Sequence, residues 1–102
     1  MPVKLFDFRL KDGSRNFADL RETVYYDELR RIARKLDGAR ETRFLTDWVT
    51  EVWLDFEYRG EKFAINSQLG DYWFIVENPA CPDQILLEVV EHFQKFFEQS
   101  DT

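Results

Sequence analysis

Residues 52–77 read VWLDFEYRGEKFAINSQLGDYWFIVE, and this stretch decides the fold that we predict. Apolar and polar side chains alternate in its first segment, which is the period of a half-buried β-strand. Arg59-Gly60 and Leu69-Gly70 are turn signals that divide the stretch into three segments. Because a register slip of one residue would mix apolar and polar side chains on both faces, the stretch predicts a three-stranded antiparallel meander over about residues 49–77.

Two-residue turns at both signals determine which residues face each other. On one face the register pairs large apolar residues: Leu54 with Ile65, Phe56 with Phe63, Ile65 with Phe74, and Phe63 with Val76. On the opposite face it pairs Trp53 with Asn66, Asn66 with Trp73, Glu57 with Lys62, and Lys62 with Glu77. Arg is a poor residue for the positive φ of such a turn, so a longer loop at Arg59-Gly60 stays open.

An amphipathic helix is predicted after the meander. The chain breaks at Asn78-Pro79 and Cys81-Pro82, and Pro82 suits the first turn of a helix. The segment that follows has a broad apolar arc, formed by Ile85, Leu86, Val89, Val90, Phe93, Phe96 and Phe97. Such an arc predicts a C-terminal helix that covers one face of the sheet and contributes much of the core.

The N-terminal segment predicts a strand and a turn. Residues 3–10 alternate well enough for a strand. A two-residue loop at Asp12-Gly13 would place Phe8 opposite Phe17. Residues 14–18 fit either a return strand or the approach to a helix.

A basic helix is the clearest element of the N-terminal half. One helical stripe is formed by Tyr25, Leu29, Ile32 and Leu36. The cations that lie off this stripe are Arg30, Arg31, Arg34 and Lys35. We predict that the helix starts near Tyr26 and that Gly38 stops it.

Together these elements predict an α+β fold in a single domain over residues 1–102. Its centre is an antiparallel β-meander within a sheet of three to five strands. The C-terminal amphipathic helix packs on one face of the sheet, and the basic helix packs on the other face or at an end.

The charge of the chain is unevenly divided and excludes several classes of function. The formal net charge is -6, but residues 1–45 hold eleven Lys and Arg against eight Asp and Glu, whereas residues 46–102 hold three against twelve. An acidic chain lacks the basic footprint of a general nucleic-acid binder.

One Cys excludes an internal disulfide, and one Cys with one His excludes a Cys/His zinc site. No apolar run is long enough to span a membrane, and the N-terminus lacks the apolar core of a signal peptide, so we expect a cytoplasmic protein without a membrane partner or cofactor.

Two residues are candidates for chemistry. His92 is the side chain that titrates near neutral pH, and it lies at the edge of the apolar arc. Cys81 lies at or just before a helix N-terminus, where the pKa of a thiol can fall. About three helical turns separate them, so they cannot act as a pair. We interpret His92 as a boundary residue and Cys81 as a packing or capping residue, and we expect no enzymatic activity.

A row of carboxylates is the remaining candidate for chemistry. Glu51, Asp55 and Glu57 share the polar side of one predicted strand. Such a row could hold a hard cation or carry out acid–base work. It lies along an extended strand, however, whereas calcium loops place their oxygens in tight turns. We therefore interpret it as an acidic face without a metal ion, and the four Gly residues form no phosphate-binding pattern.

The strongest lead is the aromatic content of the polar sheet face. Trp53 and Trp73 flank Asn66 there in the predicted register. Either this face is covered, by the N-terminal strand, the basic helix or a second copy of the chain, or it binds a partner. Trp is enriched at binding hot spots, and apolar patches rimmed by polar residues mark interaction sites.

The leading hypothesis is a small acidic, non-enzymatic protein-binding module that engages a basic protein partner. Inhibitors, immunity-type proteins and dedicated chaperones share this logic, because an acidic surface steers a basic target. The residues predicted to bind are Trp53, Trp73, Asn66, Glu51, Asp55 and Glu57. One alternative is a homodimeric structural or subunit protein. The other is a small ligand-binding domain or enzyme that uses His92 or the strand carboxylates.

Overall fold

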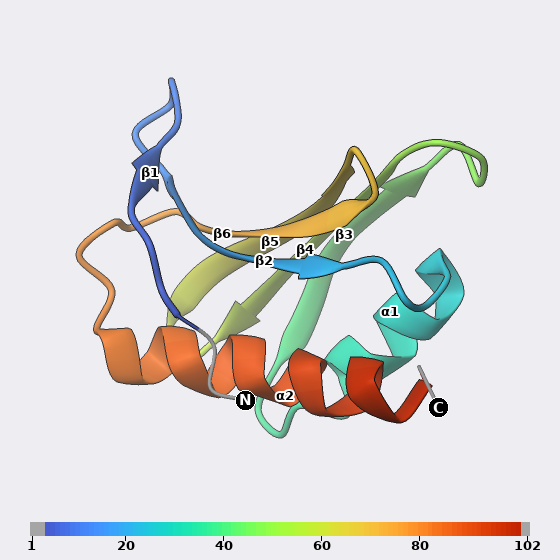
Figure 1. The fold of residues 1–102 in the computed structure, drawn as a ribbon. Helices are drawn as coiled ribbons and strands as arrows, with labels where there is room; N and C mark the ends of the chain where they lie inside the picture. Colours follow the sequence, from blue (N-terminus) through green and yellow to red (C-terminus); the bar gives the residue numbers. More distant parts are fainter. Residues whose placement is uncertain (1–3, 101–102) are drawn as a thin grey trace.

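The computed structural model describes residues 4–100, which form a curved sheet with two helices on one side (Figure 1). The strands are β1 (Phe8–Arg9), β2 (Arg15–Arg21), β3 (Arg40–Thr46), β4 (Val52–Tyr58), β5 (Glu61–Gln68) and β6 (Asp71–Val76). The helices are α1 (Tyr26–Arg34) and α2 (Asp83–Ser100). The α+β class is therefore confirmed.

The sheet has six antiparallel strands in the order β1-β2-β6-β5-β4-β3, which is more than the three to five expected. At its centre, β4, β5 and β6 form the predicted meander. Phe56 lies opposite Phe63, Trp53 opposite Asn66, and Asn66 opposite Trp73, so the predicted register is confirmed. The additional pairings are β2 with β6 and β3 with β4, on the two sides of the meander.

Both turns of the meander have the two-residue form. Arg59 and Gly60 have φ values of 51° and 79°, and Leu69 and Gly70 have values of 51° and 86°. Two positive φ values in succession match the right-handed twist of the strands that they join. The longer loop that stayed open at Arg59-Gly60 is not formed.

The core lies between the sheet and α2. Phe93 of α2 is fully buried, and its ring centroid lies 5.2 Å from that of Phe74 and 6.1 Å from that of Phe56. The apolar arc predicted for the C-terminal helix thus covers one face of the sheet. Among the described residues, neither helix is long and apolar enough to cross a membrane.

Helix α1 lies on the same side of the sheet as α2 (Figure 1). It contacts β3, β4 and α2, and the His92 Nε2 atom of α2 lies 2.7 Å from the carbonyl oxygen of Ile32 in α1. The alternative that the basic helix packs on the opposite face is therefore wrong. In the part of the chain that the structure describes, no helix covers that face.

The N-terminal hairpin differs from the prediction in length and in register. The expected strand over residues 3–10 shrinks to Phe8–Arg9, and Val3 lies outside the described residues. Phe8 lies opposite Asn16 and not Phe17. The reason is a three-residue loop, closed by a hydrogen bond of 2.9 Å from the Leu10 N–H to the Ser14 carbonyl. Residues 15–21 form the return strand, one of the two alternatives left open.

The stripe of the basic helix also needs one correction. The helix begins at Tyr26 as predicted, and Leu29, Ile32 and Leu36 are buried. Tyr25 is the residue before the first turn, and its side chain is exposed, whereas Tyr26 is buried. Tyr25 has extended backbone and precedes the helix, so the helical period does not apply to its side chain. Tyr26, three residues before Leu29, takes the core position instead.

Candidate functional site

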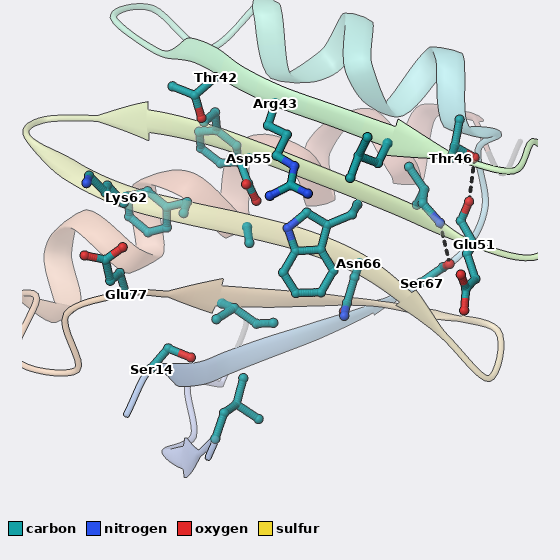
Figure 2. Close-up of a pocket in the computed structure, with 18 of the residues that line it drawn as sticks. Ser14, Thr42, Arg43, Thr46, Glu51, Asp55, Lys62, Asn66, Ser67 and Glu77 are labelled. Carbon is teal, nitrogen blue, oxygen red and sulfur yellow. Dashed lines mark hydrogen bonds between the residues drawn. The ribbon is translucent and has the colours of Figure 1, made fainter. Parts of the chain in front are cut away.

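An open hollow of about 1030 Å³ lies on the sheet face that points away from both helices, which we call the open face (Figure 2). Its floor comes from β4, β5 and β6, and β3 forms one side. The other side is formed by the turn that follows β1, through Leu10, Asp12 and Ser14. The curvature of the sheet and this turn thus create a concave surface outside the core.

The Trp–Asn–Trp row predicted from the sequence runs across this face. Trp53 and Trp73 are the pairing partners of Asn66 on the two neighbouring strands. Trp53 lines the hollow and is 38% exposed, whereas Trp73 is half-buried and lies beside the hollow, opposite Asp19 of β2. The two indoles are therefore not equivalent, and Trp53 is the accessible one.

Asn66 lies in the floor of the hollow and is only 8% exposed. Its Oδ1 atom is buried and accepts no hydrogen bond from any residue that the structure describes. Buried side-chain oxygens in folded proteins nearly always have a partner. Asn66 is thus an exception in the middle of the candidate site.

Asp55 follows Trp53 by two residues on β4, so it lies on the same face of the sheet. It is opposite Ala64 of β5 and Arg43 of β3. Burial raises the pKa of the Asp55 carboxyl, and a hydrogen bond from Trp53 and the charge of Arg43 offset part of this rise. Arg43 points toward this carboxylate (Figure 2). Asp55 nevertheless forms no ion pair with a described residue.

Carboxylates outnumber cations around the hollow by six to two. The carboxylates are Asp12, Asp47, Glu51, Asp55, Glu57 and Glu77, and the cations are Arg43 and Lys62. Most of these carboxylates belong to residues 46–102, so part of the negative charge of that half of the chain gathers around the hollow. The hollow as a whole attracts cations.

Several of these carboxylates are already engaged by the fold, and Asp12 accepts hydrogen bonds from the Ser14 N–H and hydroxyl. Glu57 forms an ion pair with Arg40 at 2.8 Å. Asp47 accepts hydrogen bonds from the Thr50 hydroxyl and from the backbone N–H groups of Val49, Thr50 and Glu51, and these bonds hold its pKa well below the usual range. The predicted row of Glu51, Asp55 and Glu57 is thus not uniform, because Glu57 has a cationic partner in Arg40. In the described residues, no group of three or more His, Cys, Asp or Glu could hold a metal ion.

An apolar rim borders one end of the hollow, where the β3–β4 loop and the β5–β6 turn project (Figure 1). We define this rim by three large side chains that are about half exposed or more, namely Leu45, Val49 and Leu69. Trp48 of the same loop does not belong to it, because its ring packs against Phe44 and Tyr25 on the helix side of the sheet. The Ser67 hydroxyl joins the two segments, since it donates to the Thr50 carbonyl and accepts from the Val52 N–H. The rim and Trp53 together give this end an exposed apolar surface.

The sequence analysis missed β3 and with it the hollow-lining residues Arg43 and Leu45. Residues 40–46 show no clean alternation, because a bulge between Glu41 and Arg43 breaks the pairing with β4. Beyond the bulge, Arg43 and Leu45 alternate with Phe44 and Thr46, and this short alternation was the signal that could have found this part of the site.

His92 lies away from the open face, at the junction of the two helices. Its Nε2 atom is 2.7 Å from the Ile32 carbonyl. Burial lowers the pKa of His92, and the charges of Lys95 and Lys35 add to this effect while the Ile32 carbonyl opposes it. His92 and the open-face carboxylates lie on opposite sides of the sheet, so no single site can use both.

Cys81 is buried just before α2 begins. Burial raises the pKa of its thiol to about 11, and the charge of Glu61 contributes. This direction is opposite to the lowering that a helix N-terminus can produce. The thiol is therefore protonated at neutral pH, which favours the packing interpretation.

Comparisons of this chain with family models, curated proteins and solved structures find no match. The functional proposal therefore rests on the residues of the open face.

Proposed function

We propose that the protein is a binding module whose open face holds a basic segment of another protein. The single observation that carries this proposal is the hollow itself, in which exposed Trp53 lies among an excess of carboxylates and is covered by no helix of the described chain. Apolar patches with a polar surround mark interaction sites. The same features agree with the hypothesis of an inhibitor-like, immunity-like or chaperone-like protein.

The charge of the hollow supports a basic partner. Carboxylates exceed cations around it, and the α1 cations are on the other side of the sheet. Complementary charge raises the rate of association and disfavours wrong partners. Salt screens such charges over roughly 8–10 Å, so we expect binding to weaken as salt rises.

The apolar rim supports a partner segment that is amphipathic as well as basic. Trp53 and Leu45 line the hollow, and Val49 and Leu69 are exposed in the loop and the turn at its end. A segment with apolar side chains at the rim and cations over Asp55 and Glu51 would complement both features. Large aromatic side chains supply much of the energy at such contacts.

A second copy of the chain is the alternative occupant, which is the homodimer hypothesis. A symmetric dimer through the open face would bring the same surface of each copy together. Carboxylates such as Glu51 and Asp55 would then oppose one another across the interface. Like charges at an interface are costly, so the charge of the hollow favours a basic protein of a different kind.

Affinity capture from the native host tests the proposal with variants matched in charge. Asp55→Asn and Glu91→Gln each remove one negative charge, the first in the hollow and the second on the exposed surface of α2. We expect the wild type and Glu91→Gln to capture the same basic protein, which high salt releases. We expect Asp55→Asn and Trp53→Ala to lose most of it while circular dichroism shows a folded chain. Equal capture by all variants would overturn the proposal.

A further inference from the structure

Asn66 contrasts with the other buried asparagine of the sheet. The Nδ2 atom of Asn16 donates to the carbonyls of Phe74 and Ala18, at 2.9 and 3.1 Å, and spans the bulge of β2. The Asn66 Oδ1 atom is equally enclosed and accepts nothing from the described residues. An unpaired buried oxygen costs free energy, and this one belongs to a residue in the floor of the open hollow. It points to a donor that the folded chain does not supply.

The surroundings of Asn66 define what kind of donor fits. Trp53 flanks it on β4, and Asp55 lies diagonally from it, across from Ala64. Such diagonal neighbours are roughly 7–8 Å apart, a gap that one group with several N–H donors can bridge. Ala64 contributes only a methyl group to the floor between them, which leaves room for a side chain from outside.

We infer that this part of the hollow is a subsite for an arginine side chain of the basic partner, and this inference rests on the proposed function. The Asn66 amide turns its enclosed Oδ1 atom toward the hollow when the guanidinium group enters. The guanidinium then donates to this atom and to the Asp55 carboxylate, and its plane lies against the Trp53 indole. Arginine carries five N–H donors in a planar fork and stacks on aromatic rings, which lysine does not do as well. Its charge compensates Asp55, which has no ion pair of its own among the described residues.

Arg43 already places a guanidinium close to this subsite. It lies opposite Asp55 in the register and points toward it (Figure 2), and its charge acts on the Asp55 carboxyl. Its side chain is exposed, so it can turn toward solvent when another guanidinium enters. Arg43 therefore competes with the arginine of the partner, and its removal strengthens binding.

An NMR titration of the isolated protein tests the subsite without the partner. The probes are Nα-acetyl-arginine amide, its uncharged isostere Nα-acetyl-citrulline amide, and Nα-acetyl-lysine amide. We expect the arginine probe to bind in the millimolar range and to shift the Asn66 side-chain amide and the Trp53 indole N–H signals. The side-chain amide of exposed Asn78 serves as the internal control. Citrulline should give no shift, and lysine a weaker one.

Variants of the subsite are expected to change the affinity for the arginine probe in opposite directions. Asn66→Leu and Asp55→Asn should weaken binding of the arginine probe about tenfold. Arg43→Ala should strengthen this binding, and Glu91→Gln should leave it unchanged.

No shift with arginine, or equal shifts with arginine and citrulline or with arginine and lysine, would overturn the inference. If these shifts are missing but capture of a basic protein still depends on Asp55, the arginine subsite is wrong and the proposed function stands. If capture also becomes independent of Asp55, both are wrong.

Discussion

At the scale of single residues, the two buried asparagines differ in what they contribute to the fold. Asn16 makes three hydrogen bonds at the β2 bulge, including one of 2.9 Å to the Phe74 carbonyl. The Asn66 oxygen makes none with a described residue, although Asn66 lies in the floor of the hollow. A residue that serves a partner and not the fold is expected to show this pattern, because function often costs stability.

We predict opposite effects for the same substitution at these two positions. Asn16→Leu should lower the free energy of unfolding by about 1–3 kcal/mol, because it leaves buried backbone carbonyls unpaired. Asn66→Leu should leave stability unchanged or raise it, because it removes an unpaired oxygen. Urea melts of the two variants measure both effects. A loss of stability at Asn66 as large as that at Asn16 would show that Asn66 is a structural residue.

His92 is the residue whose protonation should affect stability near neutral pH. Burial lowers its pKa in the folded chain, so the unfolded chain binds the proton more tightly. The stabilising contribution is therefore complete above the unfolded pKa of about 6.5 and is lost as the pH falls below that value.

The matching prediction compares the wild type with His92→Gln, which keeps a donor for the Ile32 carbonyl. Between about pH 7.5 and pH 5.5, which spans the ordinary pKa of histidine, the wild type should lose more stability than the variant. Chemical denaturation at each pH gives the difference, and the difference cancels the carboxylates that both proteins share. Parallel pH profiles would contradict the assignment of the effect to His92.

At the scale of elements, the two meander turns place non-glycine residues in the left-handed region. Leu69 has a φ of 51° and a fully exposed side chain, so its conformation is strained and its side chain packs against nothing. Arg59 has the same φ, but its side chain forms an ion pair with Glu88 at 2.8 Å. The two positions share a backbone requirement and differ in side-chain contacts.

We predict that Leu69→Asn stabilises the fold by about 0.5–1 kcal/mol, since Asn before Gly suits this turn and tolerates positive φ. Arg59→Asn is the matched control, and its gain should be smaller because the ion pair with Glu88 is lost. Differential scanning calorimetry measures both changes. A lower melting temperature for Leu69→Asn would mean that the exposed leucine contributes to folding in a way that its contacts do not show.

The elements also show how far the sequence determines this fold. The meander was predictable with its register because two turn signals and two faces agree on one pairing, as Trp53 opposite Asn66 shows. The N-terminal hairpin was shifted by one residue because Asp12 accepts hydrogen bonds from Ser14 and supports a three-residue loop. Strand β3 was not assigned, because a bulge and exposure on both sides remove its alternation.

The candidate site was predictable only in part, for the same physical reason. Trp53, Asn66 and Asp55 follow from the register of the meander, which local patterns determine. The contributions of Arg43 and of the turn around Asp12 depend on which strands flank the meander, a long-range pairing that no local pattern shows. The unpaired Asn66 oxygen depends on the packing of three strands, so it appears only in the structure.

At the scale of the whole molecule, the two sides of the sheet have different roles. One side is covered by α1 and α2 and holds the core, and its polar links, such as His92 with Ile32, join the helices. The other side carries the hollow, the exposed Trp53 and the excess of carboxylates. We therefore expect that substitutions at Trp53 or Asp55 affect binding more than folding.

Site-specific photo-crosslinking in the native host tests most directly whether the open face meets a basic protein. A benzophenone amino acid replaces Lys62, which lines the hollow, or Glu91, which is exposed on α2 and serves as the control. We predict an adduct with a basic protein from position 62 and none from position 91. An adduct only from position 91, or one from position 62 that contains two copies of this chain, would contradict the proposal that the open face binds a basic partner.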